Sequence, residues 1–124
     1  MNPTQEWPAE WLRGVLELCV LRLLADGPTY GYELAARLTQ AGLGHIKGGT
    51  LYPLLRRFEQ NGHVTVQWRP GDGGPGRKYY LLTEQGRAAL EDLTGQWREF
   101  TDLTGQLLTG RPAPTGTTRD QEVR

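Results

Sequence analysis

The sequence has few of the side chains that build metal sites. Its 124 residues include one cysteine, Cys19, and two well-separated histidines, His45 and His63. These three side chains cannot assemble a zinc site by themselves. Cys19 lies in a leucine-rich run, so we expect a buried, reduced thiol of the kind usual in the cytoplasm.

Long apolar runs are also missing. No run approaches the ~18 apolar residues that a membrane-spanning helix needs. The N-terminus, MNPTQEWPAEW, lacks the basic start and apolar block of a secretory signal. We therefore expect a cytoplasmic protein that makes no contact with a membrane.

The signatures of common enzymes are absent as well. The sequence has no Ser/His/Asp set in a plausible order and no nucleotide-binding glycine fingerprint after a strand. The glycine-rich stretch GDGGPG, residues 71–76, lies between two antiparallel strands of the predicted fold, so it does not form a phosphate cradle. We expect no enzymatic activity, no cofactor and no bound metal.

A net charge of zero conceals an uneven distribution of charge. Residues 1–44 carry a net charge of −2, residues 45–82 carry +4, residues 83–108 carry −3 and residues 109–124 carry +1. The basic residues of the middle segment are Lys47, Arg56, Arg57, Arg69, Arg77 and Lys78. Nucleic-acid binding depends on where the charge lies rather than on its total, so this segment predicts a nucleic-acid partner.

Periodicity and turn signals predict a short all-helical start, a hairpin and a final helix. Helices are expected at residues 10–25, at 30–41 with Thr29 as cap and Gly42 as stop, and from about Thr50 to Gln60. The start of the third helix stays open, because Pro53 is tolerated in the first turn after a cap at Thr50 but would crowd the Gly49 carbonyl if the helix began earlier. Strands are expected at 64–68 and 77–82, and Thr83 caps a last helix to residue 108. The fold class is mainly α (α+β), a winged helix-turn-helix over residues 1–82, with an added C-terminal dimerisation helix at 83–108 and a disordered tail at 109–124.

Two predicted helices have more apolar surface than one small domain can cover. In the first helix, Leu12 and Leu16 belong to a stripe that other leucines widen well beyond one face. The last helix carries a seam with period 3.5, a spacing typical of helices that pack along another helix. The seam comprises Gly86, Leu90, Leu93, Trp97, Phe100, Thr104 and Leu107. No later helix is predicted, so we expect a second copy of the chain to cover both surfaces.

The third predicted helix has one apolar side and one polar side. Opposite its leucines lie Pro53, Arg56 and Gln60, flanked by Tyr52 and Arg57. Arginine can bond two acceptors of guanine and glutamine can pair with adenine, so this side suits a DNA major groove. The alternative is that these side chains only face solvent. The position of the helix within the positively charged segment 45–82 favours DNA contact over this alternative.

Basic residues also flank the loop of the predicted wing. Arg69, Arg77 and Lys78 are placed where wings commonly contact phosphates or the minor groove. Alternatively, Arg77 and Lys78 protect an edge strand from aggregation. Of the two neighbouring tyrosines, Tyr79 and Tyr80, alternation predicts that one is in the core and one is partly exposed.

Three motifs in this order resemble the PadR family of bacterial transcriptional regulators: YGYEL at residues 30–34, TLYPLL at 50–55 and RKYYLLT at 77–83. The resemblance covers residues 11–108 and is strongest to compact members with a single C-terminal helix. It implies a homodimeric winged-helix repressor that binds a palindromic operator in double-stranded DNA and leaves it when a small effector binds. It also places the first and last helices at the subunit interface.

The resemblance assigns roles to particular residues. It implies DNA contacts by Tyr30, Tyr32, Thr50, Tyr52, Pro53, Arg77 and Lys78, to which the basic segment adds Lys47 and the helix face adds Arg56, Arg57 and Gln60. The expected dimer interface comprises Leu12, Leu16, Leu90, Leu93, Trp97, Phe100 and Leu107. The sequence departs from the family pattern at Gly48-Gly49, which loosens the approach to the third helix, and at Phe58, where leucine is more usual.

Some compact members of the family bind flat aromatic compounds between tryptophans at the dimer centre, and Trp97 lies at the matching place. Its indole can stack on a planar ligand beside Phe100, or it can simply fill the interface with Phe100 and Leu93. Both roles remain open. For the chain as a whole, the alternative to a DNA-binding regulator is a winged helix that contacts only proteins, but such a module would not need the basic segment.

Overall fold

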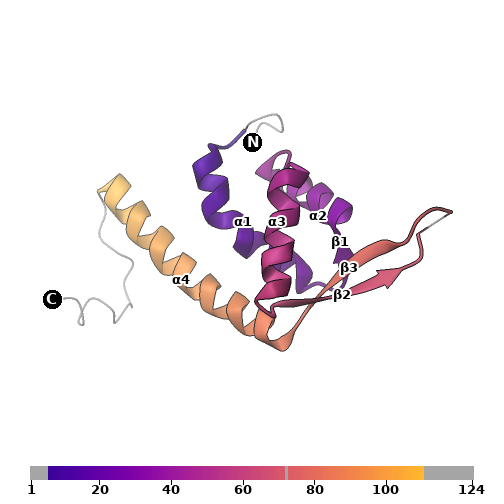
Figure 1. Cartoon of the computed structure of the whole chain (residues 1–124). Coiled ribbons are helices and arrows are strands. Elements are labelled where there is room, and N and C mark those ends of the chain that lie inside the picture. The colour runs from indigo at the N-terminus through magenta and orange to yellow at the C-terminus, as the bar shows by residue number, and fades with distance from the viewer. Residues whose placement is uncertain (1–5, 72, 111–124) are drawn as a thin grey trace. The chain divides into compact units, whose positions relative to one another are not determined.

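A computed structural model describes residues 6–71 and 73–110 of the chain (Figure 1). The chain divides into two compact units, Met1–Glu91 and Asp92–Arg124. The elements are α1 (Ala9–Leu24), β1 (Thr29–Tyr30), α2 (Gly31–Leu38), the π-helical turn η1 (Thr39–Leu43), α3 (Gly48–Gln60), β2 (Val64–Arg69), β3 (Arg77–Leu82) and α4 (Glu84–Thr109). The predicted winged helix with a long C-terminal helix is confirmed.

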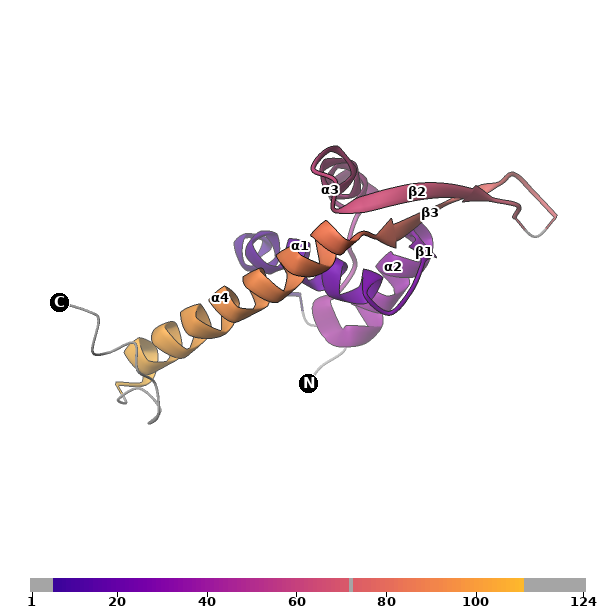
Figure 2. The ribbon, with the colours of Figure 1, turned by 90° about the horizontal axis from the view of Figure 1, so that it is seen from below.

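The core of the first unit lies where α1, α2 and α3 meet the base of the sheet. Side chains that are 5% exposed or less come from the three helices, from the three strands and, at Ile46, from the segment before α3: Leu16, Val20, Leu21, Leu24, Thr29, Leu34, Leu38, Ile46, Leu51, Leu54, Leu55, Phe58, Val64 and Tyr80. Phe58 is fully enclosed, so the larger ring that replaces the usual leucine is packed within the core. In both views, β2 and β3 extend from the helices as a hairpin (Figures 1 and 2).

The sheet has three antiparallel strands in the order β1-β3-β2, where the sequence predicted only a two-stranded hairpin. The extra strand is β1, whose Thr29 and Tyr30 pair with Tyr80 and Tyr79 of β3. The expectation that Thr29 caps the second helix was therefore wrong. Thr29 is extended and buried in the sheet, its hydroxyl donates to a carboxylate oxygen of Glu33 at 2.7 Å, and Tyr30 is the N-cap residue.

The helix α3 begins at Gly48, two residues before the predicted start at Thr50. Lys47 is the N-cap residue, and the amides of Thr50 and Leu51 both donate to its carbonyl at 3.0 Å. Pro53 therefore lies beyond the first turn, where its missing N–H deprives the Gly49 carbonyl of its usual donor. Gly49 is exposed, so water can serve this carbonyl instead, which makes the proline tolerable.

The predicted cap at Thr83 is confirmed, and it also joins α3 to α4. The amide of Gly86 donates to the Thr83 hydroxyl oxygen at 3.0 Å, and this hydroxyl donates to the Gly62 carbonyl at 2.7 Å. The Thr83 amide donates to the His63 carbonyl at 3.0 Å. A side chain at position 86 would collide with the same His63 carbonyl, so the contact requires glycine.

Most of α4 belongs to the second unit, residues 92–110 of which are described. Here Trp97 and Phe100 lie one turn apart with ring centroids 5.6 Å from each other. Phe100 is 55% exposed and Leu107 79% exposed in the single chain. The predicted disordered tail lies outside the described residues, except that Thr109 ends α4 and Gly110 follows it.

Candidate nucleic-acid interface

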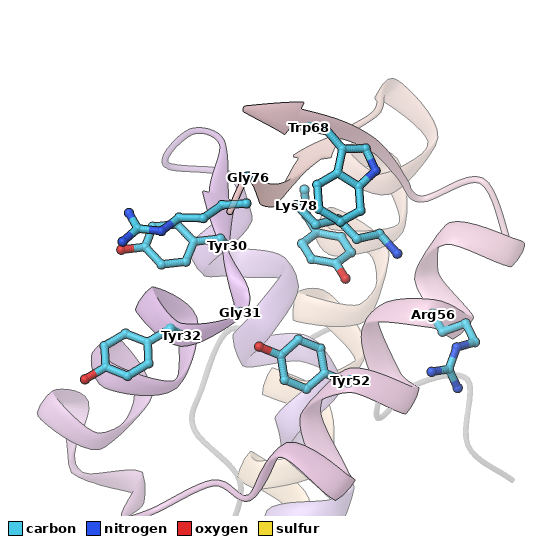
Figure 3. A pocket seen from close by; sticks show the side chains of 10 residues that line it. Tyr30, Gly31, Tyr32, Tyr52, Arg56, Trp68, Gly76 and Lys78 are labelled. Atoms are coloured by element: carbon cyan, nitrogen blue, oxygen red, sulfur yellow. The ribbon is translucent and has the colours of Figure 1, made fainter. Parts of the chain in front are cut away.

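An open hollow of about 690 Å³ lies between the start of α2, the exposed side of α3 and the hairpin (Figure 3). It brings together segments from four parts of the sequence, between Tyr30 and Tyr80. Its lining is aromatic and cationic: Tyr30, Gly31, Tyr32, Tyr52, Arg56, Trp68, Gly76, Arg77, Lys78 and Tyr80. Among the described residues no carboxylate contributes to this lining, so the hollow favours an anionic occupant.

Tyr52 lies on the side of the hollow formed by α3, and two glycines make room for its ring. A Cβ on Gly31 would lie 2.6 Å from Cε1 and Cζ of Tyr52 and nearer still to the hydroxyl oxygen. A Cβ on Gly48 would lie 3.4 Å from Cδ2. In Figure 3 the hydroxyl end of Tyr52 points toward Gly31. The ring thus bridges the starts of α2 and α3, with its side chain 45% exposed.

Two arginines on the hairpin lie over tyrosine rings. The guanidinium carbon of Arg77 is 4.6 Å from the ring centroid of Tyr30, and that of Arg69 is 4.4 Å from the ring centroid of Tyr79. The two rings contact each other, with centroids 5.2 Å apart and planes inclined by 55°. Such cation–π contacts restrict each guanidinium to a narrow set of positions at the outer surface of the sheet.

The opposite face of β3 carries Lys78 and Tyr80. The Lys78 ammonium is 5.6 Å from the Tyr80 ring centroid and 3.8 Å from a carboxylate oxygen of Glu59 on α3. Burial raises the pKa of the Tyr80 phenol, with the negative charge of Glu59 as a smaller cause, so this hydroxyl stays neutral at physiological pH. The prediction that the two adjacent tyrosines face opposite ways is confirmed, since Tyr80 is buried and Tyr79 is half-exposed.

The hollow gathers six of the eleven predicted DNA-contact residues: Tyr30, Tyr32, Tyr52, Arg56, Arg77 and Lys78. In the view of Figure 3, Tyr52 lies between Tyr32 and Arg56. The other five, Lys47, Thr50, Pro53, Arg57 and Gln60, do not line the hollow, but all are exposed along α3 or at its N-cap. Lys47 and Thr50 are near the N-terminal tip of the helix, and Gln60 is its last residue.

Four lining residues were not singled out from the sequence: Gly31, Trp68, Gly76 and Tyr80. Trp68 pairs with Lys78 across the hairpin, and 69% of its surface is exposed. Its place could have been found, because the alternation of β2 puts it on the same face as the buried Val64 but nearer the loop. The need for glycine at position 31 had no signal in the neighbouring sequence. It depends on the ring of Tyr52, which lies 21 residues further along the chain.

The residues predicted at the subunit interface differ in exposure within one chain. Leu16 and Leu90 are already buried by their own unit, at 4% and 8% exposure, and Leu12 is half-buried. In the second unit the seam residues Leu93, Trp97 and Thr104 are half-exposed, and Phe100 and Leu107 are exposed. The apolar surface that remains uncovered on α4 therefore lies beyond Leu90.

None of the helices in the described part of the chain is long and apolar enough to cross a membrane. Within the same residues, no group of three or more histidine, cysteine or acidic side chains is close enough to hold a metal ion. Burial raises the pKa of the half-buried Cys19 thiol on α1, so the neutral form is favoured, as expected for a packing residue.

Comparison with known proteins places this geometry among bacterial regulators. Residues 20–92 match the Transcriptional regulator PadR-like family. The transcriptional regulator Rv3488 of Mycobacterium tuberculosis is 34% identical over 107 residues, which cover 86% of this chain and 95% of that protein. A PadR family regulator from Eggerthella lenta is 39% identical with a TM-score of 0.73, covering 80% of this chain and 86% of its own. A PadR-like regulator from Bacillus cereus is 33% identical with a TM-score of 0.72, covering 81% and 97%.

Proposed function

The chain belongs to the PadR-like family of transcriptional regulators, and from this premise we propose that it binds double-stranded DNA as a homodimer, with α3 in the major groove and the hairpin at the adjacent minor groove. The family is one of regulators rather than enzymes. The observation that carries the proposal is the aromatic and cationic hollow between α3 and the hairpin.

The shape of DNA explains why this hollow matters. One sugar–phosphate strand separates a major groove from the neighbouring minor groove. A protein that places a helix in the first and a wing in the second must leave space for that strand between them. The hollow is such a space, and Tyr32 and Tyr52 can donate hydroxyl hydrogens to phosphates there, while Arg77 and Lys78 supply positive charge.

The exposed side of α3 supplies the groups that would distinguish one base sequence from another. Arg56 and Gln60 are one helical turn apart and fully able to reach a base edge, because both are exposed. Lys47, Thr50, Pro53 and Arg57 lie around them on the same exposed surface, where they would contact phosphates or pack against the groove wall.

The uncovered part of the α4 seam supports the proposed homodimer. Phe100 and Leu107 are large apolar side chains that a monomer would leave in water, and Leu93 and Trp97 continue the same row. A second α4, together with α1, would cover them and would bring two DNA-reading units onto a palindromic operator. We further propose a cytoplasmic repressor whose effector, if aromatic, stacks on Trp97 beside Phe100.

DNA binding at two salt concentrations tests this function. The protein should bind a labelled mixed-sequence duplex at low salt and lose affinity steeply as salt rises, because phosphate contacts release counterions. Sequencing DNA selected by the protein should then return a palindrome, which gives the operator and its half-site spacing. Absence of binding at low salt would contradict the proposal and favour a winged helix that contacts only proteins.

A single substitution examines the recognition helix. Arg56→Ala should weaken binding to the selected operator by about 1–3 kcal/mol and relax the base preference at one position in each half-site. Arg87→Ala is the matched control, since Arg87 is also exposed but lies on the first turns of α4. Equal affinities for the two variants would show that Arg56 only faces solvent.

A further inference from the structure

Two arginines lie directly opposite each other at the loop end of the hairpin. Arg69, the last residue of β2, pairs in register with Arg77, the first residue of β3. Like charges directly opposite each other destabilise a sheet. Within the described residues, neither guanidinium lies within ion-pair distance of a carboxylate. The register therefore sets two positive charges side by side, an arrangement that the pairing of the strands does not itself favour.

The aromatic side chains beside the arginines form an ordered row across all three strands. The guanidinium of Arg69 lies over the ring of Tyr79, and that of Arg77 lies over the ring of Tyr30. The two tyrosine rings contact each other and so connect β1 to β3. The guanidinium of Arg69 is further oriented by its Nε, which donates to the side-chain oxygen of Gln67 at 2.7 Å. Each cation thus lies on a ring of its own.

Stacking leaves the binding edge of each guanidinium available. A cation–π contact uses the flat face of the group, whereas its N–H bonds point outward in the plane. Within the described residues no hydrogen bond or ion pair occupies the terminal N–H groups of Arg69 and Arg77, so they can donate to an anion that presents two oxygens. Because the rings restrict both side chains in advance, less conformational entropy is lost when the anion binds.

We propose that Arg69, Tyr79, Tyr30 and Arg77 act together as a preordered phosphate clamp that extends toward the loop end of the hairpin. The proposal rests on the proposed function, and it assigns the partner of this surface as the DNA sugar–phosphate backbone. Arg69 and Arg77 are the binding residues. Tyr79 is a positioning residue, since it acts through the guanidinium of Arg69 and the ring of Tyr30.

The test compares four variants for binding to a labelled mixed-sequence duplex over a series of salt concentrations. Arg69→Gln should reduce the slope of log affinity against log salt by about one, because one phosphate contact is lost. Between about 50 and 200 mM salt, the wild type should then lose roughly three- to four-fold more affinity than this variant. Arg87→Gln, which removes one exposed charge from the first turn of α4, should leave the slope unchanged.

The two remaining variants test the positioning role. Tyr79→Phe keeps the ring and should bind like the wild type. Tyr79→Leu keeps every charge but removes the ring, and should weaken binding about two- to five-fold, the value of an exposed cation–π contact. Thermal unfolding of each variant identifies any loss of fold, and if Tyr79→Leu does not fold, Arg69→Gln still decides whether the clamp binds phosphate.

The outcomes separate this inference from the proposed function. If the wild type does not bind the duplex at low salt, the proposed function itself fails. If the wild type binds and Arg56→Ala weakens operator binding, but Arg69→Gln behaves like Arg87→Gln, only the clamp is refuted. Equal affinities for Tyr79→Leu and Tyr79→Phe would overturn the positioning role of the ring.

Discussion

Replacement of Gly31 by alanine should impair DNA binding while leaving the fold intact. The new Cβ would lie 2.6 Å from two ring carbons of Tyr52, which is too close for the ring to stay in place. Gly31 does not have a positive φ, so its backbone accepts alanine at the first position of α2. Tyr52 is 45% exposed, and its ring can therefore turn toward solvent without opening the core.

The expected loss follows from what the displaced ring would cease to do. A hydrogen bond to a charged group contributes about 1.5–3 kcal/mol, and a Tyr52 hydroxyl that donates to a phosphate belongs to this class. Loss of that bond corresponds to about 10- to 150-fold weaker binding at each half-site. Stability should change little, because replacing glycine lowers the entropy of the unfolded chain and partly offsets the cost of moving the ring.

Fluorescence anisotropy with the selected operator and thermal unfolding together provide the assay. A double-mutant cycle gives the control: in a Tyr52→Ala background, Gly31→Ala should have no further effect on affinity, since no ring remains to be displaced. An undiminished effect in that background would refute the reasoning, because it would show that the methyl group acts on DNA or on α2 rather than through Tyr52.

Three further outcomes are expected. Leu93→Asp should convert the dimer to monomer in sedimentation velocity, because it places a charge in the proposed α4 seam, and a persistent dimer would contradict the seam. Trp97→Ala should abolish fluorescence quenching by planar aromatic compounds if its indole is the stacking platform, whereas unchanged quenching would leave it a packing residue. Hydrogen bonds from Arg22 and then Arg37 hold the pKa of Asp26 below its ordinary value of 3.8, so this carboxylate stabilises the fold above that pH and the effect is lost as pH falls through the lowered pKa. Asp26→Asn should therefore lower the thermal midpoint at neutral pH and converge with the wild type in acid; a constant difference would show that the carboxylate acts without its charge.

Features set by neighbouring residues could be predicted from the sequence. The helices follow from apolar periodicity, the hairpin follows from two alternating runs around a glycine-rich loop, and the cap at Thr83 follows from a hydroxyl three residues before a helical amide. The same local logic placed Arg56, Arg77 and Lys78 on exposed surfaces near one another.

Features that depend on residues far apart in the sequence could not be predicted. The strand β1 has only two residues and exists because Thr29 and Tyr30 pair with a strand about 50 residues later. Its extended backbone removes Thr29 from the cap position that the local pattern suggested. Likewise, the need for glycine at position 31 arises from the ring of Tyr52, and nothing in the YGYEL motif itself reveals that contact.

The start of α3 could not be settled from the sequence, for a related reason. A threonine followed by a helical run is a good local start signal, yet the first turn is formed earlier, with Lys47 as the cap residue and no side-chain hydrogen bond at the cap. Two glycines in the first turn have no side chains to bury, so the helical pattern of apolar residues begins only at Leu51. Pattern-based reasoning cannot detect a turn that has no apolar face.

The hydrogen bonds around Thr83 couple the turn that follows α3 to the first turn of α4. They tie the C-terminal end of α3 at Gly62 and His63 to the first turn of α4. A rotation of that first turn would therefore move the attached end of α3 with it. The opposite end of α3 has no side-chain hydrogen bond at its cap, but the Tyr52 ring packs there against Gly31 of α2. The recognition helix is therefore positioned from both ends, by a threonine on one side and by a tyrosine ring on the other.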